Sequence, residues 1–524
     1  MSVYNLCYLF MKKIILFSAF FIALKTYAQV PEDAIRYSWY AHTGSARIMA
    51  VGGVMGSLGG DISAPFVNPA GLGLFKTREF VFSPGFMSNK NKADYREALT
   101  ENKKNALTLG PTGVIIGIPE LFKKDCSSAF SIAVNQTANF NNVVHYSALN
   151  NYSSFSEQFA EEMAKSNFSI NNILTTNSPL PYTVAPALYT YLIDTVTVNG
   201  IVQVKAAPEY LLDSGKAIMQ DMNKVTRGAM YEWAISYASN IKGKWLYGAT
   251  LSLPVLNYHS KTTFSEKDPT GDTSNHFNSF SYTDDYTTSG SGAGLKLGAI
   301  YRPKDYIRIG FAFHTPTLMN LTETRSTTLN TVLENPTHSY EVSSNTFTNN
   351  QPGEYQYNYT TPWKAMISGS YVFREVENVK RQKAFISADI EYVRHSASRY
   401  HSANADPTTD EKNYYKGLNA VIKDNYKGTF NFRVGGELKF NVIMARAGFA
   451  YYTNPYKDIA FKAGRMLLSG GLGYRNNGFF IDLTYVYQVK KDVDLPYRLA
   501  DRANTFANLH QQQGSILTTF GIKF

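Results

Sequence analysis

The chain has 524 residues and a formal net charge of +10; 44% of its residues are hydrophobic, 14% aromatic and 18% charged. This hydrophobic content excludes wholesale disorder. A bundle of membrane-spanning helices is also excluded, because each span needs about 20 consecutive apolar residues. The basic residues are spread along the chain without a block of Lys and Arg, which argues against a nucleic-acid partner and fits a mild attraction to anionic lipid headgroups.

Residues 1–28 have the layout of a secretory signal peptide. Two lysines form a positive head before the apolar stretch Ile14 to Leu24, and small residues end at Ala28. We expect cleavage after Ala28, with residues 1–10 as an upstream extension; the alternative is a buried N-terminal helix. Cleavage removes three lysines and no acid, so the formal charge falls from +10 to +7. It also leaves a single cysteine, so no internal disulfide is expected.

Residues 29–78 are dense in glycine, do not alternate like a strand, and contain the run Asn68, Pro69, Ala70 and Gly71. The segment holds too many apolar side chains to hang free in water. Irregular backbone at membrane depth is tolerated only where it is buried in protein. If the following strands form a barrel, we expect this segment to fill the lumen as an N-terminal hatch, with Asn68 to Gly71 as candidate gating residues.

From residue 79 onward the dominant pattern has a period of two. Between Phe479 and Gln488, for example, apolar residues such as Leu483 alternate with polar residues such as Asp482. Successive side chains of a strand point to opposite faces, so each segment has one apolar and one polar face. Such strands suit either a soluble antiparallel sandwich or a membrane barrel.

Three features favour the barrel. The segments run for about 9 to 15 residues, longer than typical soluble strands and long enough to cross a membrane when tilted. Their polar faces carry Gly, Ser and charge, as a lumen would, and Trp233, Trp245, Trp363 and Tyr451 lie near segment ends, where aromatic girdles lie. We therefore predict an all-β fold, a transmembrane antiparallel barrel over residues 79–524 in the cell outer membrane.

The pattern predicts about fourteen strands. They are 79–87, 112–119, 127–140, 228–239, 243–256, 293–303, 306–315, 363–374, 383–394, 426–440, 441–453, 465–476, 478–488 and 514–524. Short gaps follow most even-numbered strands, and long gaps such as 88–111, 257–292 and 316–362 follow odd-numbered ones. Short periplasmic turns and long external loops produce this alternation. The largest predicted loop is 141–227, and an even strand number places both ends of the barrel in the periplasm.

One stretch of the largest loop has helical periodicity. Phe155, Phe159, Met163 and Phe168 recur at roughly helical spacing, with acidic and basic residues elsewhere around the wheel. We interpret this stretch as an amphipathic helix. It either covers the barrel mouth or offers an apolar landing groove to a lipid-like ligand.

A set of charged residues is expected to face the lumen. Such charges either bind a ligand carboxylate or form ion pairs that hold the hatch to the wall, and the second interpretation is favoured because charges away from water need partners. The set comprises Glu232, Arg308, Asp389, Glu391, Arg433, Glu437, Arg446 and Asp482.

Motifs for catalysis or metal binding are absent from the sequence. The nine histidines are scattered, with neither HExxH nor Cys/His zinc spacing, and no GxSxG elbow occurs. The glycine run from Gly290 to Gly294 precedes a predicted strand, not a helix, so it is not a nucleotide-binding loop. We expect a protein that is not an enzyme and that uses no cofactor or metal.

The run GSARIMAVGGVMGSLGGDISAPFVNPAGLGLF, from Gly44 to Phe75, resembles the FadL/TodX family of outer-membrane transporters for long-chain fatty acids and aromatic hydrocarbons. In that family too, a Gly-rich stretch and an Asn-Pro-Ala motif precede the first strand. The strand count and the C-terminal Phe524 agree. The family's ligand-pocket residues and wall opening find no match in this sequence, and the external loops look longer than in the fatty-acid members.

The resemblance implies a fourteen-stranded barrel closed by a hatch, and we separately expect the barrel to be monomeric. A hydrophobic small molecule would land among the external loops, move to a pocket in the lumen and pass when the hatch shifts, either along the bore or sideways through the wall. Its other expected partners are outer-membrane lipids. The alternative function is a barrel scaffold subunit of a protein secretion system at the outer membrane.

Overall fold

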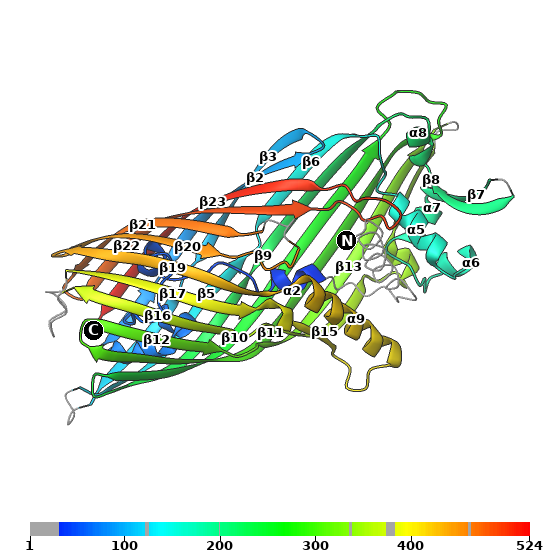
Figure 1. The fold of residues 1–524 in the computed structure, drawn as a ribbon. Coiled ribbons are helices and arrows are strands. Elements are labelled where there is room, and N and C mark those ends of the chain that lie inside the picture. Colours follow the sequence, from blue (N-terminus) through cyan, green and yellow to red (C-terminus); the bar gives the residue numbers. More distant parts are fainter. Residues whose placement is uncertain (1–30, 121–124, 199, 335–337, 374–382, 459–462) are drawn as a thin grey trace, which may run out of the picture.

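The computed structural model describes residues 31–120, 125–198, 200–334, 338–373, 383–458 and 463–524. The predicted signal peptide and its extension lie outside this part of the chain. Within it, antiparallel strands form a closed fourteen-stranded barrel, which confirms the fold class predicted from the period of two (Figure 1).

Several barrel strands consist of two successive β segments. In chain order the barrel is built from β1 (Arg78–Phe82) with β2 (Pro84–Tyr95), β3 (Ala98–Leu109) with β4 (Thr112–Pro119), β5 (Ser127–Asn139) with β6 (Asn142–Asn150), β9 (Ile218–Ile241), β10 (Trp245–Lys267), β11 (Phe277–Lys304), β12 (Ile307–His314) with β13 (Leu318–Leu333), β15 (Gly353–Thr360) with β16 (Lys364–Phe373), β17 (Ala384–Arg394) with β18 (Arg399–Ser402), β19 (Gly428–Phe440), β20 (Ile443–Tyr452), β21 (Arg465–Asn476), β22 (Phe479–Asp494) and β23 (Ala507–Lys523). The barrel closes because β1 and β2 both pair with β23.

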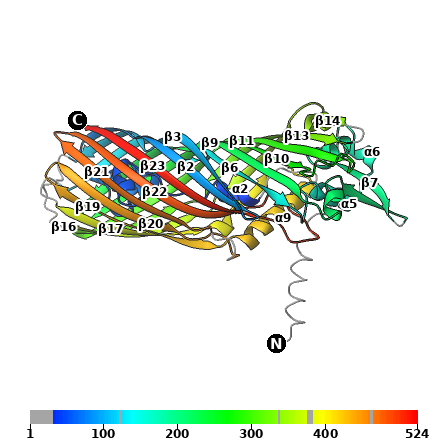
Figure 2. The same ribbon diagram turned by 90° about the horizontal axis from the view of Figure 1, so that it is seen from above.

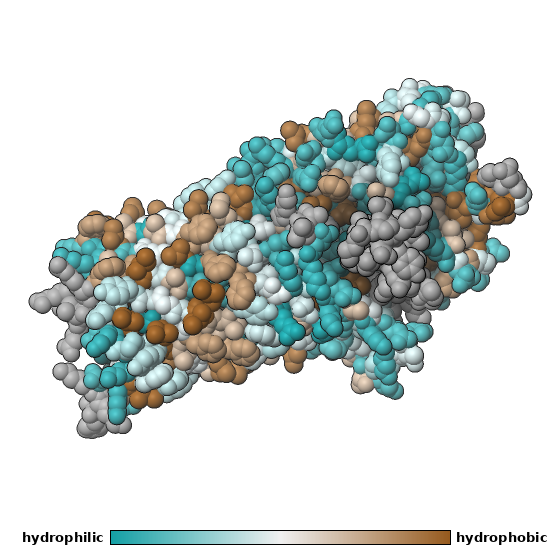
Figure 3. Space-filling view, in the orientation of Figure 1, coloured by the Kyte–Doolittle hydropathy of each residue, from teal (hydrophilic) through white to brown (hydrophobic). Residues whose placement is uncertain are grey.

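The two faces of the strands are as the alternation predicts. Leu483 is 52% exposed on the outer surface, and Ile309 and Phe520 are exposed with it, whereas Asp482 and Arg433 are buried at 1% and 2% exposure. Figure 3 shows hydrophobic residues gathered on the half of the barrel with the short turns, while the opposite half is mostly hydrophilic. This belt is the surface that meets the acyl chains.

Short turns join strands at the end of the barrel where the C-terminus lies (Figure 1). Asn441 and Val442, for instance, link β19 to β20, and Asn477 and Gly478 link β21 to β22. Both Asn441 and Asn477 have positive φ, which tight hairpin turns require. No helix in the described residues is long and apolar enough to cross a membrane.

At the other end many strands run further than predicted. Residues 88–111, expected as a loop, form the β2–β3 hairpin, which turns at Arg96 and Glu97 with positive φ. Most of 257–292 and 316–362 likewise continues β10, β11 and β13. The prediction of these ends was wrong because beyond the membrane both faces of a strand meet polar surroundings, so the alternation disappears.

The long-loop end carries helices and small strands (Figures 1 and 2). These are α5 (Glu157–Lys165), α6 (Ile170–Ile173), α7 (Val184–Tyr189), the two-stranded sheet of β7 (Ile193–Val198) and β8 (Ile201–Ala206), α8 (Glu209–Asp213), β14 (His338–Ser343), η3 (Ser344–Phe347), η5 (His395–Ala397) and α9 (Thr409–Asn425). They cover this end of the barrel. All of them except η5 and α9 share one buried hydrophobic cluster with the extended strands, whereas α9 packs in a second cluster that includes α2.

The N-terminal segment lies inside the barrel. It contains α2 (Pro31–Arg36), α3 (Ala46–Ala50), α4 (Ala64–Val67) and the 3-10 helix η2 (Pro69–Leu74). Helix α3 contacts β20 to β23, while η2 contacts β5, β9, β10 and β11 on the other side of the lumen. Its apolar side chains pack with inward-facing residues of the wall such as Ala129, Ala234 and Phe385.

Candidate functional site

Asn68 fixes the start of η2 against the barrel wall. The side chain is fully buried; its Nδ2 donates to the carbonyl oxygens of Gly56 (2.6 Å) and Phe311 (3.2 Å), and its Oδ1 accepts from the Ala70 backbone N–H (3.1 Å). An Asn at a helix N-cap satisfies a donor that would otherwise be unpaired. Here it also binds the segment to itself and to strand β12.

Glycines on the inner wall make room for this motif. A Cβ added at Gly248 of β10 would lie 2.6 Å from the Ala70 nitrogen, and one at Gly298 of β11 would collide with the Asn68 side chain. Gly248 and Gly298 are register partners on adjacent strands. The wall therefore has a flat patch, without side chains, on which the Asn-Pro-Ala turn rests.

A second glycine patch receives the turn after α3. Gly435 of β19 and Gly448 of β20 are register partners, and a Cβ at Gly448 would lie 2.7 Å from the Cα of Gly52. Gly52 itself has φ +75, a conformation that favours glycine. The segment is thus packed backbone to backbone against two separate regions of the barrel.

Charged residues join the segment to the wall as well. The Asp389 carboxylate accepts from the backbone N–H groups of Met55 (3.0 Å) and Gly56 (3.2 Å), and it lies 3.6 Å from Arg433 Nε. Arg433 also reaches Glu391 at 3.5 Å. This cluster compensates a buried guanidinium with two carboxylates and uses one of them to hold the N-terminal segment.

A second cluster centres on Arg446, whose side chain is fully buried between Glu437 (Nε to Oε2, 2.6 Å) and Asp482. Arg47 of α3 approaches the same Glu437 oxygen at 3.5 Å, and Arg475 approaches Asp482 at 3.5 Å. Three guanidinium groups therefore share two carboxylates at the contact between α3 and the wall.

The remaining predicted lumen charges behave similarly. Glu232 is paired with Lys296, whose ammonium donates to the Phe66 carbonyl oxygen (3.2 Å), and Arg308 donates to the Leu58 carbonyl oxygen (2.6 Å). The predicted charges thus face the lumen and contact one another or the N-terminal segment. This arrangement supports the ion-pair interpretation over a ligand site built from these eight residues.

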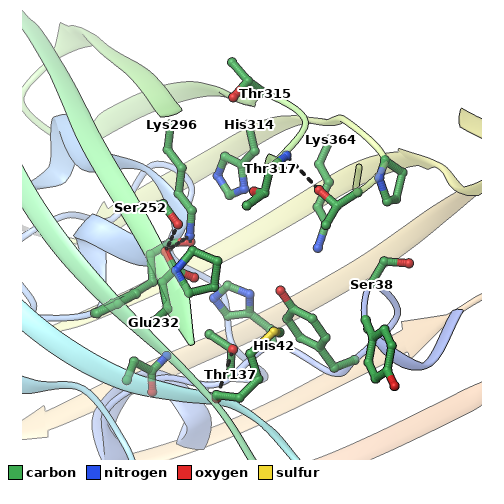
Figure 4. Close-up of a pocket in the computed structure, with 18 of the residues that line it drawn as sticks. Ser38, His42, Thr137, Glu232, Ser252, Lys296, His314, Thr315, Thr317 and Lys364 are labelled. Carbon is green, nitrogen blue, oxygen red and sulfur yellow. Dashed lines mark hydrogen bonds and ion pairs between the residues drawn. The ribbon is translucent and has the colours of Figure 1, made fainter. Parts of the chain in front are cut away.

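A small cavity of about 80 Å³ lies between the N-terminal segment and strands β5, β9 to β13, β16 and β17, and Figure 4 shows its lining. Lys364 points into it with its ammonium 4.9 Å from the centre of the Tyr40 ring. Glu232 and Glu391 line the same cavity, but they pair with Lys296 and Arg433, and among the residues that the structure describes no carboxylate forms an ion pair with Lys364. His42 points into the same space, and its Nε2 has no hydrogen-bond partner among those residues.

A larger cavity of about 440 Å³ adjoins the first, since both are lined by Tyr40, His42, Thr43 and Thr137. Its volume is in the range of small-molecule sites, which is about 300 to 1,000 Å³. The lining mixes apolar side chains with charged ones and extends from the N-terminal segment to the junctions between β3 and β4 and between β5 and β6.

At these junctions the barrel wall has a seam. β3 forms a ladder with β2 only and β6 with β9 only, and no backbone hydrogen bond joins residues 98–109 to 139–150. Polar groups bridge the gap instead. These bonds include Asn89 Nδ2 to Asn141 O (2.8 Å), Asn91 Nδ2 to Val143 O (2.5 Å), Thr100 Oγ1 to His145 O (2.5 Å), Asn102 Nδ2 to His145 O (3.2 Å), Leu109 N to Gln136 Oε1 (3.2 Å) and Asn139 Nδ2 to Leu107 O (3.2 Å).

The predicted loop helix is present as α5, but its apolar side chains do not line an open groove. Phe155, Phe159 and Met163 are buried, and Phe155 stacks on Phe264 of β10 with ring centres 4.5 Å apart. Phe168 lies beyond the helix and is exposed. These contacts favour the covering role for the helix over the landing groove.

Glu157 at the start of α5 is a buried carboxyl in this cap. It accepts from the Ser154 backbone N–H (2.6 Å) and lies 3.2 Å from Arg502. Burial raises the pKa of Glu157 to about 7, although the Ser154 hydrogen bond and the Arg502 charge both act to lower it. The carboxyl is therefore poised to change charge near neutral pH.

Sequence reasoning missed the wall glycines, Lys364 and the seam. The wall glycines could have been recognised in the sequence, because they occupy lumen-facing positions of strands in which polar and apolar residues alternate. They are Gly248, Gly298, Gly435 and Gly448. The sequence contains no pattern that would single out Lys364 or the seam. The seam depends on which strands fail to pair. In the described residues, no group of three or more His, Cys, Asp and Glu side chains could hold a metal ion.

A closed barrel with an apolar belt, a filled lumen and internal cavities defines an outer-membrane transport protein. The family model for outer membrane protein transport proteins (OMPP1/FadL/TodX) matches residues 28–519, so the chain belongs to this family. The family consists of transport proteins, and no comparison supports the secretion-scaffold alternative. A comparison with curated proteins finds no match.

Solved structures similar to this chain are barrels of the same family. The toluene transporter TodX of P. putida is 12% identical with a TM-score of 0.50, and the alignment covers 93% of this chain and 99% of that one. The Ralstonia pickettii toluene transporter TbuX (16%, TM-score 0.48, 93% and 100% covered) and a Pseudomonas aeruginosa FadL homologue (14%, 0.49, 92% and 99%) are also similar. The TodX likeness supports the fold alone.

Proposed function

We propose that this protein takes up hydrophobic small molecules across the outer membrane and that its N-terminal segment is the gate. The observation that carries the proposal is the pair of adjoining cavities between this segment and the wall, of about 80 and 440 Å³. A ligand held there contacts the segment directly. Binding can therefore shift the segment, which rests on glycine patches and ion pairs and not on a continuous hydrogen-bond ladder.

Lys364 indicates which class of ligand the protein transports. The cavity is also lined by Glu232 and Glu391, but these carboxylates pair with Lys296 and Arg433, so the Lys364 ammonium is left to attract an anion. A small cavity beside a larger one accommodates a polar head with an apolar tail. These features favour an amphiphile with an acidic head, such as a long-chain fatty acid, over a neutral aromatic hydrocarbon. Replacing Lys364 with Met should weaken binding of a long-chain fatty acid and leave toluene binding unchanged. Equal affinities of the variant and the wild type for the fatty acid would contradict this assignment.

The seam between β3 and β6 is the proposed exit. The larger cavity reaches it through Leu109, Gly110 and Gln136. Polar side-chain bonds across the gap can open without breaking the ladders on either side, whereas leaving between β22 and β23, for example, would break a continuous β ladder. An apolar cargo that leaves sideways enters the membrane without passing through water.

Cross-linking tests this route. In a Cys126→Ser background, Leu107→Cys and Asn139→Cys place thiols on opposite sides of the seam, where a bis-maleimide can bridge them. The matched control bridges Phe311→Cys and Ile367→Cys, exposed register partners on an ordinary ladder. We expect cross-linking at the seam to abolish uptake of a labelled long-chain fatty acid and the control to leave it unchanged. Unchanged uptake after complete seam cross-linking would instead place the exit along the bore.

Substituting the Asn-Pro-Ala turn tests the gate. Asn68→Ala removes the side-chain bonds that hold η2, and Pro69→Ala loosens its first turn. Both should change uptake while the barrel keeps its heat-modifiable migration, and Asn413→Ala on the exposed face of α9 should change neither. If Asn68→Ala also abolished heat-modifiable migration, the motif would be needed for assembly and not for gating.

A further inference from the structure

The outer face of strands β22, β23, β2 and β3 carries a cluster of basic side chains. These strands lie side by side in Figures 1 and 2, and their ladders fix which residues share a level. One row reads Lys491, His510, Lys92 and Glu101 across the four strands, and the row beneath it reads Val489, Gln512, Lys90 and Lys103. Directly opposite residues of an antiparallel pair share a face. We call this cluster the basic patch.

The patch has more positive charge than its own acid can compensate. Glu101 lies 2.5 Å from Lys90 and 3.8 Å from Lys92. Within the described part of the chain, neither Lys103 nor Lys491 has an ion-pair or hydrogen-bond partner for its ammonium. Lys90 and Lys103 stand directly opposite each other, and like charges in such positions are destabilising. An anion bound between them would relieve this repulsion.

The height of the patch matches a lipid headgroup layer. The apolar belt on these strands ends at Phe86, which pairs with Leu107 and Ile516, and all three are exposed. Lys90 is four residues further along β2, which is about 13 Å along the strand and about 9 Å along the membrane normal at a typical tilt. Headgroups extend about 5 to 8 Å beyond the hydrocarbon on each side, and a lysine side chain can bend back toward them.

We propose that the basic patch binds the phosphate groups of an anionic glycolipid of the outer leaflet, of the lipid A class. The exposed residues Phe86, Leu107 and Ile516 lie below the patch and contact the acyl chains, while Lys90, Lys103 and Lys491 hold the phosphates. Asp94, the next acidic residue on the same face, lies one pair beyond Lys92, away from the membrane. The charge therefore becomes positive toward the lipid side.

Native mass spectrometry of the detergent-extracted protein with added bisphosphorylated lipid A tests this site. The double variant Lys103→Gln with Lys491→Gln removes two charges without breaking an ion pair or hydrogen bond seen in the described residues. Because one surface lysine contributes about fivefold to binding an anionic membrane, two should contribute about 25-fold at low salt. The matched control, Lys412→Gln with Lys416→Gln, removes the same charge from the exposed face of α9 and should retain lipid A like the wild type.

Two further measurements distinguish charge-dependent lipid binding from nonspecific lipid binding. The conservative variant Lys103→Arg with Lys491→Arg should retain lipid A, and dephosphorylated lipid A should bind the wild type weakly. The proposal is overturned if the Gln variant retains as much lipid A as the wild type, if the α9 control loses as much as the Gln variant, or if removing the phosphates leaves wild-type binding unchanged. Because the readout is lipid retention, it is independent of the uptake function proposed above.

Discussion

Adding one methyl group to the inner wall should displace the N-terminal segment and spare the barrel. In Gly248→Ala the new Cβ would lie 2.6 Å from the Ala70 nitrogen, a backbone atom, where an ordinary contact needs about 3.5 Å. The segment must therefore retreat by about 1 Å. Overpacking of this kind costs about 1–3 kcal/mol. The barrel itself should not suffer, since Ala is better than Gly in a strand interior by about 0.5–1 kcal/mol.

This displacement of the N-terminal segment also lengthens the hydrogen bonds of the Asn68 side chain. Its contact with the Phe311 carbonyl, now 3.2 Å, would exceed hydrogen-bonding distance, and each such bond contributes about 0.5–1.5 kcal/mol. The combined shift of about 2 kcal/mol or more corresponds to an increase of about 30-fold in the population of the displaced segment. Hydrogen exchange of the amides of residues 64–75 should accelerate by that factor, while heat-modifiable migration stays normal.

Gly369→Ala is the matched control, because Gly369 of β16 is exposed on the outer face with no atom within 4 Å of its added Cβ. It should leave exchange of residues 64–75 unchanged. If Gly248→Ala and Gly369→Ala gave the same exchange rates, close packing on the glycine patch would not be what holds the segment.

Three further predictions concern the lipid-facing wall, the buried Arg446 ion pairs and the cap formed by α5. Leu483→Arg puts a charge on the lipid face and should cost about 2–4 kcal/mol near the midplane, so an unchanged urea midpoint in liposomes would contradict the face assignment. Arg446→Met leaves Glu437 and Asp482 buried without their central cation and should lower the free energy of unfolding by about 3–5 kcal/mol in the same assay. The raised pKa of Glu157, about 7, means that its protonated form is favoured in the folded cap; the cap is then most stable below the ordinary carboxyl pKa and loses stability as pH rises through 7. Exchange of α5 amides, corrected for intrinsic rates, should therefore be slower at pH 5.5 than at pH 8. Burial also raises the pKa of Glu266, which accepts from the Phe155 backbone N–H, to about 7. Glu157→Gln should therefore reduce the difference, and Glu157→Gln with Glu266→Gln should remove it.

The membrane-embedded part of the wall was predictable because lipid and lumen impose opposite chemistry on alternate residues. Leu483 and Asp482 are neighbours in sequence and lie on opposite faces, as the alternation requires. This contrast ends where the strands leave the membrane. The sequences of the outer halves of β10, β11 and β13 therefore have the polar composition of loops and predict no strand. The aromatic residues of α5 were found by their helical spacing, but the spacing could not say that Phe155 stacks on Phe264, more than a hundred residues away.

The barrel, its two faces, the irregular N-terminal segment and the charges that face the lumen were predictable from the amino-acid sequence, because each depends on local alternation or composition. Four features could not be predicted from that local pattern: which charges pair, where the wall glycines meet the Asn-Pro-Ala turn, that Lys364 lines a lumen cavity, and that β3 and β6 do not form a ladder. These features depend on the register of strands and on contacts across the lumen. Residues such as Asn68 and Gly298, or Lys90 and Gln512, come together only when the barrel closes.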